Sequence, residues 1–181
     1  MIINMPKLLV IYSTSDGQTQ KIADFIANEI RENYEKVTII NINDIKDVNI
    51  NEYSHIIIGA SIRYGKFSKA IYSFIDDTFA ILNSKKTAFY SVNLTARKFD
   101  KNTPETNSYT RKFLARIQWK PKKCAVFAGA LVYPQYKLLD KYMIKLIMKI
   151  TKGETDTTKS IDYTDWLYVK TWARDFAEKL K

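Results

Sequence analysis

The sequence predicts an α/β protein built on a doubly wound sheet of five parallel strands. Short apolar segments alternate with amphipathic ones, each apolar segment is apolar on both faces, and turn-forming residues follow the first of them. The apolar segments are 8–12, 37–40, 56–60, 88–92 and 125–128. Strands buried on both faces need helices on each side of the sheet and right-handed crossovers, so we expect the strand order 2-1-3-4-5.

Helices are predicted wherever apolar residues recur at spacings of three and four. This spacing covers 22–30 and 70–79, and a stripe from Trp166 to Leu180 predicts a C-terminal helix. A further helix is expected to begin at Thr103-Pro104, with threonine as N-cap and proline in the first turn. In a sheet of this order, ligands bind beyond the carboxyl ends of the strands. The loops after strands one, three and four are therefore the candidate site.

Length and composition indicate a single folded domain over residues 1–181. Apolar residues make up 46% of the chain and charged residues 27%. The only cysteine, Cys124, lies in an apolar segment and is expected to be buried and unreactive; no metal site is predicted. We expect neither a signal peptide in residues 1–6 nor a membrane-spanning segment, which needs about 18 apolar residues.

The net charge of +10 favours an anionic partner, such as a nucleic acid, a membrane surface or an acidic substrate. Solubility alone would also account for it. Nucleic acid is disfavoured because basic residues and aromatic residues do not alternate on one exposed face.

The loop after the first strand has the composition of a phosphate site. Its residues are Thr14, Ser15, Asp16, Gly17, Gln18 and Thr19. Hydroxyl groups, a glycine turn and the N–H groups of a helix N-terminus together suit an anion. The loop lacks the lysine of nucleotide-hydrolase loops and the three glycines of dinucleotide folds. Asp16 is expected to point away from the anion or to cap the helix, and a plain capped turn remains the alternative.

The loops after strands three and four complete the predicted site. Their residues are Ser61, Ile62, Arg63, Tyr64, Gly65, Ser91, Val92, Asn93 and Leu94. Gly65 suits a positive φ, and Ile62 or Tyr64 could stack on a flat ligand. Arg63, Arg97 and Lys98 are candidates for holding a carboxylated substrate, because cationic side chains pair with carboxylates. Ordinary solvated surface residues are the alternative.

Residues 131–162 form an insertion between the fifth strand and the last helix. Within it, 137–150 reads as an amphipathic helix in which Lys141, Lys145 and Lys149 share one side. The other side carries Leu139, Tyr142, Met143, Leu146 and Ile147. Such a helix can lie on an anionic membrane, pack on the body of the protein, or pack on a second subunit in a homo-oligomer.

Several segments resemble one family in particular. The loop at 14–19 is similar to the phosphate loop of flavodoxins, which bind FMN. The whole chain resembles the menaquinone-dependent protoporphyrinogen IX dehydrogenases of bacteria, long-chain flavodoxin-like enzymes of haem biosynthesis. The resemblance rests on STSDGQT at 13–19, IGASIRYG at 58–65, FYSVNLTARK at 89–98, TPETNSY at 103–109, MIKLIMK at 143–149, KGETD at 152–156 and YTDW at 163–166.

The resemblance implies an FMN enzyme that oxidises protoporphyrinogen IX and passes the electrons to menaquinone or ubiquinone. It implies peripheral attachment to the cytoplasmic side of the bacterial inner membrane, and the loops after strands three and four would flank the flavin ring. It identifies no catalytic base. The alternatives are an electron-shuttle flavodoxin without its own substrate, which is usually acidic, and a flavin-free adaptor that binds membranes through 137–150.

Overall fold

The computed structural model describes residues 5–179, and five of their strands form one parallel sheet. These strands are β1 (Lys7–Ser13), β2 (Lys36–Asn41), β3 (His55–Ser61), β4 (Lys86–Asn93) and β5 (Lys123–Ala128). Their order is β2-β1-β3-β4-β5, which confirms the predicted topology. The switch in strand order falls between β1 and β3, where such sheets bind ligands.

The three inner strands are buried on both faces and end at nearly the same level. Residues 8–11 of β1 expose no surface. Ser13 of β1 pairs in register with Ala60 of β3, and Ser61 of β3 pairs with Val92 of β4. The loops that follow these strands therefore begin side by side.

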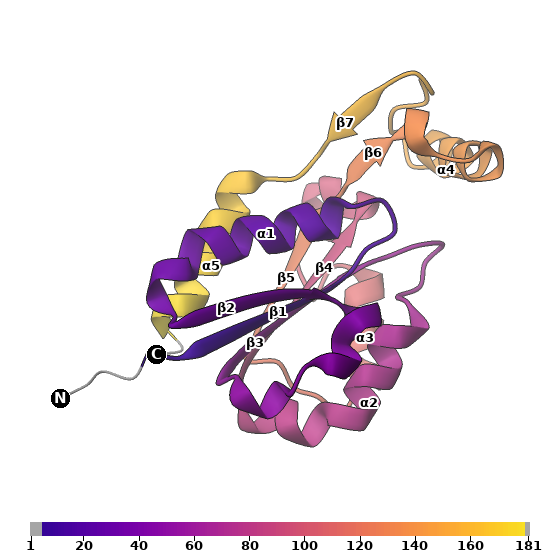
Figure 1. Cartoon of the computed structure of the whole chain (residues 1–181). Coiled ribbons are helices and arrows are strands. Elements are labelled where there is room, and N and C mark those ends of the chain that lie inside the picture. Colours follow the sequence, from indigo (N-terminus) through magenta and orange to yellow (C-terminus); the bar gives the residue numbers. More distant parts are fainter. Residues whose placement is uncertain (1–4, 180–181) are drawn as a thin grey trace.

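Helices cover both faces of the sheet (Figure 1). One layer contains α1 (Gln18–Ile30) and α5 (Trp166–Lys179), and the other contains α2 (Lys69–Ser84) and α3 (Ser108–Arg116). Each layer closes its own apolar cluster against the sheet. Short 3₁₀ helices occupy the connections: η1 (Arg31–Asn33), η2 (Ile42–Asp47), η3 (Ile50–Glu52), η4 (Leu94–Arg97), η5 (Phe99–Lys101) and η6 (Tyr133–Gln135).

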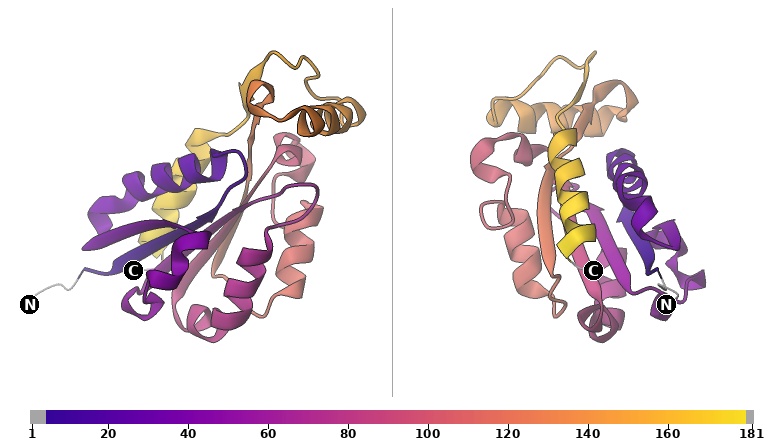
Figure 2. Two further views of the ribbon diagram at one scale, coloured as in Figure 1. Left: turned by 45° about the vertical axis from the view of Figure 1, so that its right-hand side comes forward. Right: turned by 90° about the vertical axis from the view of Figure 1, so that its left-hand side faces the viewer.

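The insertion after β5 lies beyond the carboxyl ends of the sheet (Figures 1 and 2). It contains α4 (Leu138–Ile150), as predicted, and two short antiparallel strands, β6 (Ala130–Val132) and β7 (Ser160–Asp162). The sequence does not predict this pair, because three-residue strands separated by 27 residues leave no periodic pattern. The two strands bring the chain from β5 out to α4 and back to α5.

Helix α4 packs on the body through a narrow side. Ile144 and Met148 are buried against Leu131 and Tyr133 of the β6–η6 segment. At about 100° per residue, this buried pair lies beside the lysine row and not in the centre of the broad apolar face. That face stays exposed, so packing on the body does not account for it.

The start of α3 differs from the prediction. The helix begins at Ser108, and the side chain of Asn107 caps it by accepting a hydrogen bond from the N–H of Thr110 at 3.2 Å. Thr103 belongs to a separate turn, in which its hydroxyl accepts from the N–H of Thr106 at 3.2 Å. Asn107, and not Thr103, is the N-cap because its buried side chain is also fixed by a second hydrogen bond, in which it donates to Asn93 Oδ1 at 3.1 Å.

Helix α5 follows the predicted stripe, with Val169, Ala173 and Phe176 buried against the sheet. Leu180, at the end of that stripe, lies outside the described residues. Within residues 5–179, no helix combines the length and the apolar character that crossing a membrane requires.

Candidate functional site

A cavity of about 440 Å³ lies where β1, β3 and β4 end. It is lined by Thr14, Asp16, Gln18, Thr19, Ser61, Ile62, Arg63, Tyr64, Gly65, Val92, Asn93, Leu94, Thr95, Tyr109, Gly129, Ala130, Tyr136, Met143, Ile144 and Ile147. The first twelve of these were singled out from the sequence as ligand-binding residues, and Met143 and Ile147 as candidate contacts with a membrane or quinone. Ser15, Gly17 and Ser91 belong to the same loops and strand but are not among the lining residues.

The loop after β1 opens directly into α1. Gly17 adopts a φ of 85°, a left-handed conformation that a side chain would strain, and its N–H donates to the hydroxyl of Thr14 at 2.9 Å. The first intrahelical bond runs from the N–H of Lys21 to the carbonyl of Gly17 at 3.1 Å. The N–H groups at the start of α1 therefore have no intrahelical acceptor and are available to an anion.

The hydroxyl of Thr19 is the clearest sign of a missing partner in this loop. The residue is fully buried, and among the described residues its Oγ1 atom makes no hydrogen bond. Buried hydroxyl groups are nearly always paired, because an unpaired one loses its hydration without compensation. Since Thr19 also lines the cavity, an occupant with an oxygen acceptor would satisfy it.

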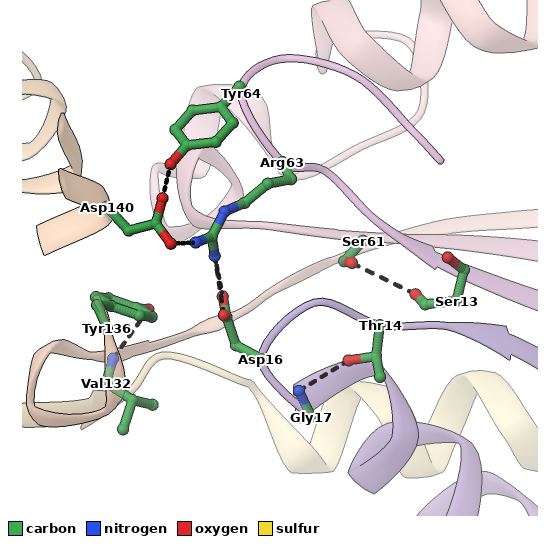
Figure 3. A network of polar contacts seen from close by, with 10 residues as sticks. All are labelled: Ser13, Thr14, Asp16, Gly17, Ser61, Arg63, Tyr64, Val132, Tyr136 and Asp140. Carbon is green, nitrogen blue, oxygen red and sulfur yellow. Dashed lines mark hydrogen bonds and ion pairs between the residues drawn. The ribbon is translucent and has the colours of Figure 1, made fainter. Parts of the chain in front are cut away.

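Asp16 is held by Arg63 and does not cap α1. Nη1 of Arg63 lies 2.8 Å from both carboxylate oxygens of Asp16, while Nη2 lies 2.7 Å from Oδ2 of Asp140 on α4 (Figure 3). Of the two expectations for Asp16, capping of the helix is wrong, since Gly17 is the N-cap and no side chain bonds there. The arginine balances the charge of the carboxylate at the edge of the cavity and links this loop to the insertion.

Tyr64 contributes a second link between the loop after β3 and α4. Its φ is 50°, and its hydroxyl donates to the carboxylate of Asp140 (Figure 3). The Arg63 guanidinium lies 5.3 Å from the centre of the Tyr64 ring and 5.6 Å from that of Tyr136. Gly65 has a φ of 76°, as its position in the predicted turn suggested.

The loop after β4 is fixed by the side chain of Asn93. Its Oδ1 accepts from the N–H of Ala96 and from the amide of Asn107, both at 3.1 Å. The side chain of Ser91 is directed toward α3, where its hydroxyl shares a hydrogen bond of 2.7 Å with the hydroxyl of Thr110. The backbone of this loop is consequently held in one shape at the edge of the cavity.

Two of the three predicted substrate cations already have partners within the chain. Arg63 forms the ion pairs described above, and Arg97 donates to the carbonyl of Leu94 at 2.8 Å and to the carbonyl and hydroxyl of Thr151 at 3.1 and 2.8 Å. Within the described part of the chain, Lys98 pairs with no acidic side chain. Lys98 is therefore the most available of the three to an external carboxylate.

Six lining residues were not singled out from the sequence, and they fall into two groups. Thr95, Tyr109, Gly129 and Ala130 belong to the loop after β4, to α3 and to the segment that follows β5, and the carboxyl-end rule applied to every strand would have flagged them as a region. Tyr136 and Ile144 come from the insertion, as do Met143 and Ile147, which the sequence suggests as contacts with a membrane or quinone and not as part of the cavity. Their approach depends on how α4 folds back, which no local pattern encodes.

A second hollow lies at the opposite, amino-terminal end of the strands. It is open, has a volume of about 1100 Å³, and is lined in part by Tyr34, His55 and Lys85. It shares no residue with the three loops at the carboxyl ends. The residues singled out from the sequence therefore gather at one end of the molecule.

Cys124 lies on β5, half-buried, and burial raises the pKa of its thiol to about 12. At neutral pH the sulfur is protonated and a poor nucleophile, which agrees with the sequence-based expectation. Among the described residues, no group of three or more histidine, cysteine and acidic side chains is placed to hold a metal ion.

Comparison with known proteins assigns the fold and the family. The flavodoxin domain family matches residues 9–158. Oxidised flavodoxin 1 from Bacillus cereus superimposes with a TM-score of 0.56 at 19% identity, covering 97% of this chain and 99% of that one. A short-chain flavodoxin associated with a bacterial microcompartment gives a TM-score of 0.58 at 12% identity, covering 98% and 100%. These two likenesses concern the fold.

Two curated relatives are much closer in sequence. The protoporphyrinogen IX dehydrogenase (quinone) of Escherichia coli K12 is 50% identical over 171 residues, which cover 94% of each chain. The Leishmania major protein of the same name is 48% identical over 180 residues, covering 98% of this chain and 77% of that one. With about half of its residues identical over nearly its whole length, the chain belongs to the flavodoxin-domain family of the quinone-type protoporphyrinogen IX dehydrogenases.

Proposed function

We propose that this protein binds FMN in the cavity and oxidises protoporphyrinogen IX to protoporphyrin IX, with a membrane quinone as electron acceptor. The observation that carries the proposal is the 50% identity over 94% of the chain to a relative of that name. The cavity supports it, because the fold brings the three predicted loops to one place. The loss of six electrons from the porphyrinogen would take place in three two-electron steps.

The residues of the cavity fit a flavin mononucleotide. The N–H groups at the start of α1 and the hydroxyl groups of Thr14 and Thr19 would hold the phosphate without a lysine. Ile62, Tyr64 and Leu94 would flank the flat ring, with the backbone near Asn93 and Leu94 at its polar edge. When bound, the flavin supplies the two-electron redox chemistry between porphyrinogen and quinone.

The substrate is an apolar macrocycle with two propionates, and the apolar wall that α4 contributes to the cavity suits it. Met143 and Ile147 of α4 contribute apolar side chains to the lining of the cavity. Lys98 would pair with a propionate, while Arg63 and Arg97 would keep the surrounding loops in place. Because the porphyrinogen releases protons as it is oxidised, a chain without a dedicated base can leave them to solvent.

The exposed face of α4 would contact the membrane that contains the quinone. Leu139 is 75% exposed, Tyr142 70%, Leu146 53% and Ile150 73%. Lys141, Lys145 and Lys149 lie on the same helix, beside this face. An apolar face bordered by lysines suits the boundary of an anionic bilayer, here the cytoplasmic side of a bacterial inner membrane.

Reconstitution with flavins tests the cofactor first. The flavin-free protein should bind FMN and quench its fluorescence, and should bind riboflavin at least tenfold more weakly because riboflavin lacks the phosphate. The loaded protein should then convert protoporphyrinogen to fluorescent protoporphyrin with a soluble quinone. If the flavin-free protein does not bind FMN, the proposal is contradicted. A flavin-loaded protein without turnover on any quinone would instead indicate an electron shuttle.

A further inference from the structure

Phe99 is the most exposed large apolar side chain in the described part of the chain. It belongs to η5, and 92% of its surface is accessible to solvent. A phenyl group in this position contributes nothing to the folded core, since it touches almost no neighbour. An exposed aromatic ring gains favourable free energy only when a partner removes it from water.

The segment that carries Phe99 is joined to α4. Arg97, two residues earlier, donates to the carbonyl and the hydroxyl of Thr151, the residue that ends α4. Leu94, at the start of η4, packs on the cluster that contains Ile144 and Met148. Both views in Figure 2 place this connection beside α4, at the same end of the sheet.

The charges around Phe99 match those along α4. Lys98 precedes Phe99 and Lys101 follows it, with Asp100 as the single acidic residue between them. Both basic segments border the cavity, since Leu94 and Thr95 line it from η4 and Met143 and Ile147 line it from α4. An anionic bilayer complements both segments at once, whereas a flat positively charged protein surface would be repelled.

We propose that Phe99 is a second membrane anchor, which enters the interface of an anionic bilayer alongside the exposed face of α4. This inference rests on the proposed function, since it takes the bilayer contact of α4 as given. Two anchors, one on each of two segments that line the cavity, would hold the molecule in one orientation. In that orientation the wall of the cavity that these segments form would lie next to the lipid in which the quinone is dissolved.

Site-specific fluorescent labels test the inference directly. An environment-sensitive dye on Phe99→Cys, Leu146→Cys or Glu52→Cys reports positions on η5, on α4 and on η3 at the far end of the sheet. Cys124, with its raised pKa, reacts slowly, and the unchanged protein treated in parallel gives the blank. Vesicles of phosphatidylglycerol and phosphatidylcholine should shift the emission at positions 99 and 146 to the blue, and nitroxide lipids should quench it. Position 52 should not respond.

The outcomes separate this inference from the proposed function. A response at 146 without one at 99 overturns the second anchor and leaves the contact of α4 intact. Absence of a response at both positions overturns both. A shift at 99 that grows with protein concentration in the absence of vesicles would show that a second copy of the chain covers Phe99, and it would also overturn the inference.

Vesicle affinity provides the second measurement. Phe99→Ser should lower the partition coefficient about tenfold, the ratio expected for withdrawing one phenyl group from apolar contact. Phe99→Leu should retain most of the affinity, since it keeps an apolar side chain. Equal affinities for the serine variant and the unchanged protein would contradict the proposal, and neither variant removes a contact of the fold.

Discussion

In the loop after β1, the side chains of Thr19 and Asp16 are those expected to affect the binding of an anion most. Thr19 has a buried hydroxyl without a partner among the described residues, and Asp16 has a carboxylate paired with Arg63. The first offers a donor, and the second would repel a phosphate if its charge were not balanced. Both therefore predict specific effects on the binding of FMN.

Replacement of Thr19 by valine should weaken FMN binding by about tenfold to a hundredfold and leave the stability of the flavin-free protein nearly unchanged. The hydroxyl has no partner in the chain to lose, whereas a charge-assisted hydrogen bond to phosphate is worth about 1.5–3 kcal/mol. Fluorescence titration and a thermal melt measure the two quantities. Thr14→Val provides the contrast in stability, because its hydroxyl accepts from the N–H of Gly17 and its loss should lower the melting temperature as well as the FMN affinity. Unchanged FMN affinity in Thr19→Val would contradict this assignment.

Replacement of Arg63 by methionine should also weaken FMN binding, because it leaves the Asp16 carboxylate unbalanced near the phosphate. For a partly exposed pair we expect an effect of about 1 kcal/mol, or about fivefold. Adding Asp16→Asn in the same chain should restore most of the affinity. If the double variant binds no better than Arg63→Met alone, the arginine acts on the flavin by another route.

Helix α4 is the element whose position depends most on polar contacts across the cavity. It buries only Ile144 and Met148, and Asp140 in its first turn accepts from Tyr64 and pairs with Arg63. The apolar contacts alone are few for a helix of 13 residues. We infer that these polar contacts keep α4 over the cavity.

Replacement of Asp140 by asparagine should loosen α4 without unfolding the sheet. The variant loses the ion pair with Arg63, and its neutral amide oxygen accepts from Tyr64 more weakly than the carboxylate does, while the cores on both faces of the sheet are untouched. Hydrogen exchange should become faster in 138–150 and stay unchanged in β1, β3 and β4. Asp77→Asn, on the exposed side of α2, is the control. Uniform acceleration throughout the chain would indicate global destabilisation instead.

The same contacts should make α4 sensitive to acid. The hydrogen bond from Tyr64, together with the charge of Arg63, lowers the pKa of Asp140 below its ordinary value of 3.8. A carboxylate with a lowered pKa stabilises the folded state above 3.8, and this contribution is lost as the pH falls through the lowered value. Pepsin, which is active in acid, should therefore begin to cut 138–150 in that range. Asp140→Asn should be cut already at pH values above the ordinary range of aspartate.

The sequence predicts the sheet and the three loops because each depends on local patterns. Buried strands are continuous apolar runs, and the parallel topology places their carboxyl ends together. The pairing of Arg63 with Asp16 and with Asp140 could not be predicted, because the two partners lie 47 and 77 positions from Arg63 along the chain. The start of α3 was misplaced because the tertiary bonds of Asn107 outweigh the local signal of Thr103-Pro104.

The periodicity of the sequence also could not predict what the apolar face of α4 contacts. A stripe that covers the body and a stripe that covers lipid have the same spacing. Ile144 and Met148, outside the apolar side identified in the sequence, are the residues that pack on the body. Only the folded position of the helix separates the two possibilities.

At the scale of the molecule, the positions of the positive charges matter for membrane binding, in addition to their total of +10. The triple replacement of Lys141, Lys145 and Lys149 by glutamate should weaken binding to anionic vesicles by two orders of magnitude or more, at about 1 kcal/mol for each lysine removed and further repulsion from each glutamate. Lys46, Lys120 and Lys122 are exposed and lie far from α4. Their triple replacement by glutamate changes the net charge by the same amount and should weaken vesicle binding much less. Equal losses in the two variants would mean that only the net charge matters.

Turnover on vesicles tests the central claim most directly. The FMN-loaded protein is supplied with protoporphyrinogen IX and with anionic vesicles that contain menaquinone as the only acceptor, and protoporphyrin fluorescence is followed without oxygen. We expect product to form at a rate that rises with the quinone content of the vesicles and falls when the three lysines of α4 are replaced by glutamate. A flavin-loaded protein that binds these vesicles and forms no protoporphyrin would contradict the account.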